Sequence, residues 1–256
     1  MKKIKKKNKK NTMYLYIYDS FLNDKKYNDL LIKIEKRVTD LGIKGRVVRL
    51  SVLKNMKELI IDGIKDGVET IIVTGDTKTF SKVINITANL NITLGLIPVN
   101  SNNKIAKMLG IPPGVLACEI LSSRIIKRID LGKANKYYFI NKAYINNGIV
   151  EIDYGNFKIM PITKENNITF YNFSSNKKFN PTDGILETVI TPIKSTFFGK
   201  KLIKSTIFPF DNIKINSLSD EQATLLIDEQ IIVKTPIKIN VIPKKLKIIV
   251  GSERNF

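Results

Sequence analysis

Three short segments of this sequence carry the residue types that could do chemistry. Two are polar loops that would supply hydroxyl, amide and backbone N–H groups, and the third is an acidic turn that would supply carboxylates. The segments are Gly75-Asp76-Thr77-Lys78-Thr79, Asn100-Ser101-Asn102-Asn103-Lys104 and Asp228-Glu229-Gln230. Any chemistry here must therefore depend on carboxylates, lysines, hydroxyls and backbone amides, with or without a hard metal ion.

The composition excludes several other classes of site. The 256 residues contain no histidine and one cysteine, Cys118. Because histidine is the commonest metal ligand and acid–base group, Ser-His-Asp and Cys-His catalysis, zinc fingers and His-ligated zinc enzymes are all excluded. A single cysteine also excludes a disulfide framework, and we expect Cys118 to be a small buried apolar residue on a helix.

The chain is strongly basic, with 43 Lys and Arg against 23 Asp and Glu, a net charge of +20. Seven lysines within residues 1–12 form a predicted flexible arm, and subtracting them leaves +13. Such a charge favours anionic partners, namely nucleotides, nucleic acid or an anionic membrane surface. A general Lys- and Asn-rich composition explains the same charge. Nucleic acid is the least favoured partner, because aromatic residues do not interleave with the lysines.

The elements that position the two loops are predicted by hydrophobic periodicity. After the arm, apolar runs of strand length alternate with helical stripes that end at residues such as Gly42 and Gly67. The predicted strands are 13–18, 46–50, 70–74 and 93–97. This alternation predicts a Rossmann-like, doubly wound parallel sheet. Ligands of such sheets bind beyond the carboxyl ends of the strands, where both loops would lie.

The second half of the chain changes character near Arg124. Short β-rich runs separated by Asn, Gly and Pro predict an antiparallel β-sandwich, with strands at 125–131, 137–140, 148–154, 185–193, 202–208, 223–227, 231–235, 237–242 and 246–250. The Asn-rich stretch 164–181 predicts an exposed loop. We therefore expect an arm at 1–12, an α/β nucleotide-binding-like domain at 13–123 and a β-sandwich domain at 124–256. The apolar run 13–18 stops at Asp19, too short for a signal or a membrane span, so we expect a cytoplasmic protein.

Four stretches, in this order, resemble the diacylglycerol kinase catalytic-domain family, which includes sphingosine kinases and bacterial lipid kinases. They are IIVTGDTKTFSKVIN, LGLIPVNSNNKIAKMLGIP, RIDLGKANKYYFIN and LLIDEQIIVKTPIKINVIPKKLKIIV. The resemblance implies the same two-domain fold, with ATP in the cleft between the domains. The related NAD kinases share the loop, but the Leu-Gly-Ile-Pro and closing Ile-Pro-Lys segments fit the lipid kinases better.

The resemblance also implies roles for the polar loops. Gly75 and Thr79 match the first glycine and the threonine of the family's GGDGT loop, while Asp76, Thr77 and Lys78 replace its centre. Asn103 matches the asparagine of the second loop. The nucleotide-binding residues implied are Gly75, Asp76, Thr77, Lys78, Thr79, Asn100, Ser101, Asn102 and Asn103. Two of the three glycines that let backbone approach phosphate are missing, so this phosphate loop is degenerate.

The acidic turn matches the family's Asp-Gly-Glu segment. The resemblance implies that Asp228 is the general base on a lipid hydroxyl, and that Glu229 or Asp76 helps to hold Mg²⁺ through water. The alternative is that Asp228 and Glu229 only cap a hairpin. Asp183-Gly184 resembles a family segment near a structural Mg²⁺ site, but an ordinary turn is the stronger interpretation, as a strand-end carboxylate is for Asp130.

The sequence thus favours a diacylglycerol-kinase-like protein that transfers phosphate from ATP, with Mg²⁺, to a lipid hydroxyl, at times peripheral to the membrane. The alternative is an inactive member of the family that binds a nucleotide, a lipid or a protein. The two differ in whether Asp228 faces the loop at Gly75–Thr79 across an open cleft. The long insertion that helps to form the family's lipid pocket is reduced between Asn141 and Pro181.

Overall fold

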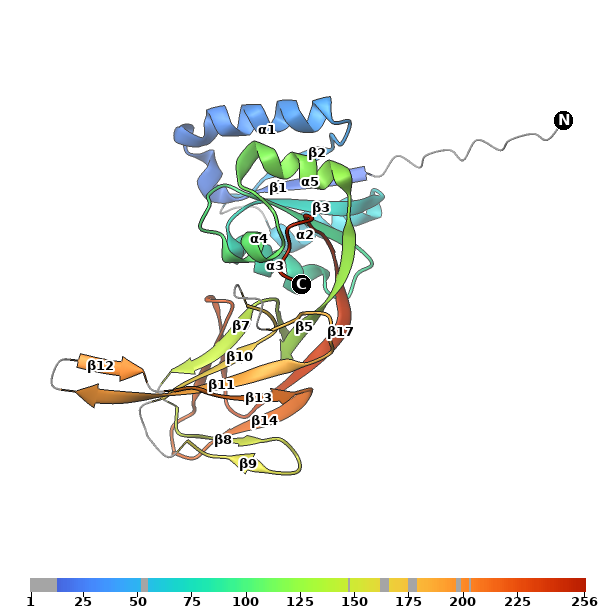
Figure 1. The fold of residues 1–256 in the computed structure, drawn as a ribbon. Coiled ribbons are helices and arrows are strands. Elements are labelled where there is room, and N and C mark those ends of the chain that lie inside the picture. The colour runs from blue at the N-terminus through green and yellow to red at the C-terminus, as the bar shows by residue number, and fades with distance from the viewer. Residues whose placement is uncertain are drawn as a thin grey trace.

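The computed structural model describes residues 13–51, 55–146, 148–161, 166–174, 179–196, 199–202 and 204–256. The predicted basic arm, 1–12, lies outside the described residues. Figure 1 shows two bodies, a helix-covered sheet and a β-sandwich, joined by long strands. This is the predicted fold class, an α/β domain followed by an antiparallel β-domain. No described helix has both the length and the apolar character that crossing a membrane requires.

The first sheet is parallel and has the strand order β2-β1-β3-β4. Its strands are β1 (Met13–Tyr18), β2 (Arg46–Arg49), β3 (Val68–Gly75) and β4 (Thr93–Pro98). All residues of β4 and nearly all of β3 are buried, as expected for strands covered on both faces. In Figure 1 α1 (Asn28–Asp40) and α5 (Ala117–Ser123) lie above the sheet, and α2 (Met56–Lys65) and α3 (Thr77–Thr87) lie below it.

Shorter segments complete the first body. They are the helix α4 (Lys104–Met108) and the 3-10 turns Ser20–Asn23, Lys25–Tyr27 and Gly114–Leu116. The helices α2, α3 and α4 each begin at a capping residue whose side chain accepts a hydrogen bond from a backbone N–H of the first turn. These capping residues are Asn55, Asp76 and Asn103 respectively. These caps satisfy amides that have no partner within the helix. Cys118 is fully buried in α5, as the sequence predicts.

The first sheet continues into the sandwich through its last strand. β17 (Ile237–Ile249) runs parallel to β4 at one end and antiparallel to β5 (Ile126–Ala134) along most of its length. Beyond β17 the sheet adds β14 (Asn212–Ser217), β8 (Val150–Asp153) and β9 (Lys158–Ile159), while β6 (Tyr137–Phe139) pairs with β5. The two bodies are therefore tied by continuous hydrogen-bonded strands.

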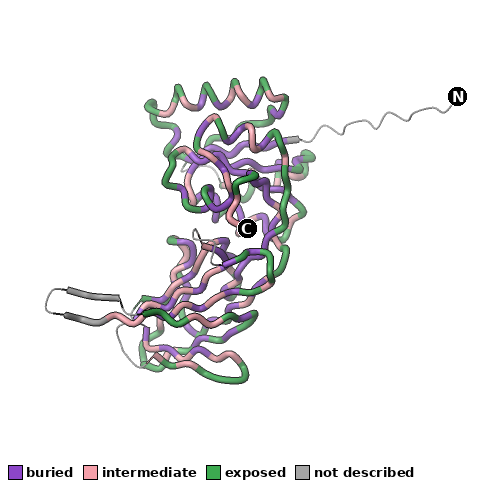
Figure 2. The backbone as a smooth tube through the Cα atoms, in the orientation of Figure 1, coloured by how far each residue is buried: buried purple, intermediate pink, exposed green. Residues whose placement is uncertain are grey.

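The second sheet is antiparallel and packs against this extension. Its path is β12 (Gly199–Leu202), β11 (Leu186–Thr196), β10 (Asn166–Tyr171), β7 (Lys142–Asn146), β15 (Thr224–Ile227) and β16 (Ile231–Lys234), with β13 (Thr206–Phe210) beside β11. The inward side chains form one apolar core, separate from the core of the first body. Figure 2 shows the buried residues gathered in these two places.

The structure corrects several predicted elements of the second half. The stretch 164–181 is not all loop, because it contains β10 in the middle of the second sheet. Its pattern alternates, with Ile168 and Phe170 buried and Thr169 and Tyr171 half-buried. Strands β7 and β14 were not predicted, and the predicted strand 202–208 is divided between β12 and β13. The Asn-rich composition of these segments favoured a loop prediction. Their strands are indicated instead by the alternation of buried and less buried residues along the chain.

The last strand of the chain packs with the first body as well as with the sandwich. The predicted domain boundary at residue 124 itself stays a prediction. Residues 246–250, predicted within the sandwich, belong to the core of the first body. The predicted strands 237–242 and 246–250 form one strand, β17, with a register shift between Ile242 and Leu246. The backbone N–H of Asn255 then donates to the carbonyl of Met108 in α4, 2.9 Å away.

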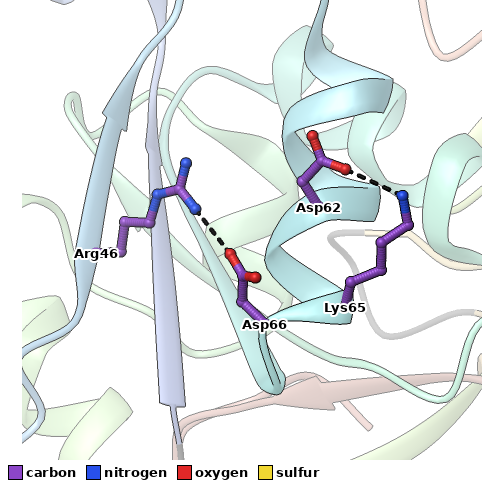
Figure 3. Close-up of polar contacts among 4 residues, drawn as sticks. All are labelled: Arg46, Asp62, Lys65 and Asp66. Carbon is purple, nitrogen blue, oxygen red and sulfur yellow. Dashed lines mark hydrogen bonds and ion pairs between the residues drawn. The ribbon is translucent and has the colours of Figure 1, made fainter.

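Two exposed ion pairs lie where β2 meets the end of α2 (Figure 3). Arg46 Nη1 is 3.2 Å from Asp66 Oδ2, and Lys65 Nζ is 3.2 Å from Asp62 Oδ1. The four side chains are 50% to 72% exposed, so water and salt screen both pairs and they contribute little to stability. These exposed ion pairs differ in this respect from the polar contacts of the candidate site, which are buried.

Candidate functional site

The first predicted loop turns sharply between β3 and α3. Gly75 is buried against Asp19, and a Cβ added to Gly75 would lie 2.7 Å from the Asp19 Cβ, closer than real contacts allow. The Asp76 carboxylate then accepts a hydrogen bond from the Thr79 backbone N–H at 2.9 Å and so begins α3. Glycine at position 75 is thus required by its close approach to the Asp19 side chain, and its predicted role beside phosphate stays a prediction.

Asp19 is a site residue that the sequence analysis missed. It directly follows β1, is 7% exposed, and accepts a hydrogen bond from the Thr79 hydroxyl. Its backbone N–H donates to the Thr74 carbonyl at 3.0 Å, which fixes it beside the loop. Its position at the carboxyl end of a buried strand was the available signal, because side chains at strand ends meet at one edge of a parallel sheet.

The two predicted loops meet at Asn103. The Thr77 hydroxyl donates to Asn103 Oδ1 at 3.3 Å, and the same oxygen accepts from the Ala106 backbone N–H at 2.9 Å. Asn103 is 7% exposed, and its Nδ2 has no hydrogen-bond partner among the described residues. Asn100 and Asn102 are exposed, with the Asn102 N–H donating to Asn100 Oδ1. The loops therefore present one buried, unpaired amide donor.

Asp228 lies in the turn between β15 and β16, only 2% exposed and with φ of 43°. Its two carboxylate oxygens accept four hydrogen bonds. The donors are the backbone N–H groups of Ile140, Asn141 and Lys142 at 3.1 to 3.2 Å, and the Ser81 hydroxyl of α3 at 2.9 Å. Burial raises the pKa of Asp228, and these four donors oppose the rise.

The same turn docks the sandwich on the first body. Besides the Ser81 contact, Gln230 Nε2 donates to the Lys78 carbonyl at 3.0 Å. The predicted hairpin is present, since the Gln230 N–H donates to the Ile227 carbonyl within the turn. The carboxylate of Asp228, however, binds groups from the turn between β6 and β7, from the start of β7 and from α3 rather than from its own hairpin. The hairpin-cap interpretation therefore accounts for the turn and not for the side chain.

A cavity of about 120 Å³ lies where these elements converge. It brings together residues from both predicted loops and the acidic turn: Thr77, Asn102, Lys104, Ile105, Asn141, Asp228 and Glu229. We call it the polar cavity. Gly75, Asp76, Lys78, Thr79, Asn100, Ser101 and Asn103 do not line it, and Lys78 is exposed. The arrangement combines hydroxyl, amide and ammonium donors, which can hold an anionic group, with the two carboxylates of the acidic turn.

A larger cavity of about 580 Å³ adjoins the polar cavity and shares Lys104 and Asn141 with it. It lies on the outer face of the second sheet and is bounded by α4. Lys142, Tyr171, Val189, Lys204 and Ile207 contribute to its walls. We call it the lysine groove. The sequence analysis missed this groove because its lining comes from segments far apart in the sequence, two of which, β7 and β10, were not predicted as strands.

The described residues contain no group of three or more Cys, Asp or Glu side chains placed to hold a metal ion. A protein-built metal centre is thus not a feature of this part of the chain. Mg²⁺ commonly binds through one or two carboxylates together with substrate phosphates and water. Asp76 at the start of α3 and Glu229 at the polar cavity are donors of that kind, and they fit Mg²⁺ only in that shared form.

Glu187 is a half-buried carboxylate on the outer face of the second sheet, directly cross-strand from Tyr171. Its Oε2 is buried without a hydrogen-bond partner among the described residues. Burial, with a smaller contribution from Asp183, raises the pKa of Glu187 to about 7. Folded protein therefore holds this proton at pH values where unfolded chain has released it.

Glu187→Gln is expected to remove a pH dependence of stability. Because the folded-state pKa of Glu187 is raised, its charge destabilises the fold progressively as pH rises from about 4.5 to 7. At pH 8 the variant should be more stable by about 1–2 kcal/mol after allowance for solvent screening, with no difference near pH 4. Urea unfolding at both pH values measures this. An equal effect at pH 4 and pH 8 would contradict ionisation as the cause.

Comparison with known proteins identifies relatives of both sequence and fold. Residues 14–134 match the family described as "Diacylglycerol kinase catalytic domain". The diacylglycerol kinase of Bacillus subtilis (strain 168) is 38% identical over 79 residues, 29% of this chain and 26% of that protein. The diacylglycerol kinase of Staphylococcus saprophyticus is 27% identical over 118 residues, 45% of this chain and 37% of that protein. This chain thus matches well under two thirds of the length of either relative.

Solved structures match over nearly the whole chain. The crystal structure of a diacylglycerol kinase from Bacillus anthracis str. Sterne superposes with a TM-score of 0.75 at 20% identity, covering 94% of this chain and 97% of that chain. A putative diacylglycerol kinase from the same strain gives a TM-score of 0.76 at 16% identity, with the same coverage. At these identities the structures establish the fold, and the sequence match over residues 14–134 confirms the family resemblance.

Proposed function

We propose that this chain, whose residues 14–134 match the diacylglycerol kinase catalytic-domain family, transfers the γ-phosphate of ATP to a hydroxyl group of a lipid. The polar cavity is the observation that carries the proposal. It joins Thr77 and Asn102, from the two polar loops, to Asp228 and Glu229 of the acidic turn. Phosphoryl transfer needs these components close together, namely a phosphate site and a carboxylate for the acceptor hydroxyl.

In this proposal the nucleotide phosphates lie at Gly75–Thr79 and Asn100–Asn103. Three observations support the assignment. The start of α3 directs backbone N–H groups towards the loop, Asn103 Nδ2 is a buried donor without a partner among the described residues, and Lys104 adds a positive charge at the polar cavity. Helix N-termini and unpaired donors favour anions. Lys78 is placed to offset the two missing glycines as a point charge.

The proposed reaction breaks the bond between the γ-phosphorus and its bridging oxygen and forms a new bond to the acceptor oxygen. The hydroxyl proton passes to a carboxylate of the acidic turn, and ADP leaves. We assign Asp228 as the group that orients this hydroxyl and accepts its proton; Glu229, exposed beside it in the same cavity, is the second candidate. Mg²⁺, when bound through Asp76 or Glu229 and the phosphates, would neutralise charge on the transferred group.

The acceptor is proposed to reach the protein at a membrane surface. The net charge of +20 would attract the chain to anionic lipid, at about 1 kcal/mol per lysine near the surface. A cytoplasmic protein that binds the membrane peripherally fits this charge.

Transfer of γ-phosphate to diacylglycerol in mixed micelles with Mg²⁺ tests the proposal. We expect transfer by the unaltered chain, and a fall in kcat of about 100- to 10,000-fold in Asp228→Asn with ATP binding retained. Glu229→Gln measured beside it decides between the two carboxylates, and Asp40→Asn, an exposed carboxylate on α1, is the matched control. Binding of ATP without transfer to any of several lipids would contradict the kinase proposal and favour a non-catalytic relative. Absence of both binding and transfer would reject a nucleotide site.

A further inference from the structure

The lysine groove has the form of a small-molecule site rather than of a surface depression. Its volume of about 580 Å³ lies within the range of about 300–1,000 Å³ that ligand pockets occupy. It is bounded on one side by α4 of the first body, through Lys104 and Met108, and on the other by the second sheet. The groove therefore lies between the two bodies of the fold.

The floor of the groove, formed by β10, β11 and β13, is largely apolar, whereas the rest of its lining includes asparagine, serine and lysine side chains. Tyr171 and Val189 are outward residues of β10 and β11, and Ile207 is paired directly with Val189 in β13. The ring of Phe179 lies 5.2 Å from the ring of Tyr171 and extends this surface. Burial raises the pKa of Tyr171, so its phenol stays neutral. A floor of this kind suits a hydrocarbon chain.

The charge of the groove has one sign. Lys104, Lys142 and Lys204 contribute to its walls. Among the described residues, no Asp or Glu lines it, and none of the three lysines forms an ion pair with a carboxylate. On the same sheet face Glu187 lies cross-strand from Tyr171, and burial raises its pKa to about 7, so it offsets only part of this charge near neutral pH. Uncompensated lysines beside an apolar floor favour an amphiphile with an anionic group.

The groove is continuous with the proposed reaction site. Asn141 and Lys104 line both the groove and the polar cavity. The backbone N–H of Lys142 donates to Asp228 Oδ1 at 3.2 Å, while its side chain lines the groove. A ligand held by the lysines therefore has its headgroup next to the carboxylates of the acidic turn.

We propose that the lysine groove binds a phospholipid that bears a free hydroxyl, so that the protein prefers this anionic amphiphile to neutral diacylglycerol as the acceptor. The lysines would bind the lipid's own phosphate, the apolar floor its acyl chain, and the free hydroxyl would enter the polar cavity. The identity of this lipid as the acceptor rests on the proposed function, whereas its binding does not.

Calorimetric titration with a short-chain, monomeric phosphatidylglycerol, without ATP, tests the binding apart from any membrane surface. We expect it to bind at least about tenfold more tightly than the matching neutral diacylglycerol and than inorganic phosphate alone. The double variant Lys142→Gln and Lys204→Gln should lose about tenfold in this affinity. Lys36→Gln, on the exposed face of α1, should retain it. A thermal unfolding scan of each variant verifies that the fold is intact.

Each other result would overturn the inference. Equal affinity for the neutral lipid would remove the role of the lysines, and equal affinity for inorganic phosphate would remove that of the apolar floor. Weakened ATP binding with unchanged lipid binding in the double variant would assign the groove to the nucleotide. Two results distinguish this inference from the proposed function. Selective lipid binding without phosphoryl transfer would contradict only the proposed kinase activity. Transfer to diacylglycerol without preference for the anionic lipid would contradict only the proposed lipid specificity of the lysine groove.

Discussion

Asp228→Ala is expected to lower the free energy of unfolding by about 3–5 kcal/mol, the largest single effect that the site allows. The substitution removes a carboxylate that is 2% exposed and that accepts four hydrogen bonds. It leaves three backbone N–H groups and the Ser81 hydroxyl without their acceptor in a buried place. Each unsatisfied buried donor costs about 1–3 kcal/mol, so their combined loss exceeds that of an ordinary side-chain truncation.

Urea unfolding of Asp228→Ala beside two controls measures this effect. Glu229→Gln changes the next residue of the same turn, which is exposed, and should alter the free energy of unfolding by less than about 0.5 kcal/mol. Ser81→Ala removes one of the four donors and should cost about 1 kcal/mol. If Asp228→Ala cost no more than Ser81→Ala, water would be replacing the carboxylate and the anchoring role would be wrong.

This stability effect bears on how the kinase assay is interpreted. Asp228 holds the turn between β6 and β7 to α3, so loss of activity in an Asp228 variant combines loss of a carboxylate with loss of domain docking. Asn at position 228 keeps one oxygen acceptor and tolerates the left-handed backbone, whose φ is 43°. Glu229→Gln leaves the docking intact. A fall in kcat with Glu229→Gln at unchanged stability would therefore assign the proton acceptor to Glu229.

The first body was largely predictable because its evidence is local. Strands 13–18, 70–74 and 93–97 are continuous apolar runs, and Asp76 and Asn103 lie where helix caps belong, so the order of elements and both polar loops followed from spacing. The sandwich was harder, because β10 and β7 are Asn- and Tyr-containing strands stabilised by cross-strand neighbours far away in sequence.

Some residues that line the polar cavity could be named from the sequence, but their geometry could not, and their roles stay predictions. Asp228, Glu229, Thr77 and Asn102 do line one cavity. Nothing in the sequence near Ser81 indicates that it pairs with a carboxylate 147 residues later. Such contacts depend on how two bodies dock, which is decided by many apolar side chains together rather than by any motif.

Asp130→Ala is expected to cost about 2–4 kcal/mol of the free energy of unfolding. Asp130 is fully buried, and its carboxylate accepts the backbone N–H groups of Gly184 at 2.8 Å and Lys244 at 2.6 Å. It thus ties β5 to the turn before β11 and to the irregular part of β17. The predicted strand-end position of Asp130 is wrong, because Asp130 lies in the middle of β5, which continues to Ala134. Asp183 forms an ordinary turn by accepting the Ile185 N–H.

Asp183→Ala is the matched control, because this exposed carboxylate in the same turn should contribute less than about 0.5 kcal/mol. Asp130→Asn keeps one acceptor oxygen, so its loss of unfolding free energy, measured by urea unfolding, should lie between those of Asp130→Ala and Asp183→Ala. Since Gly184 leads directly into β11, whose Val189 lines the lysine groove, Asp130→Ala should also weaken lipid binding while leaving ATP binding unchanged. Equal losses of both ligands would indicate global unfolding, and no loss of stability would show that the two amides find other acceptors.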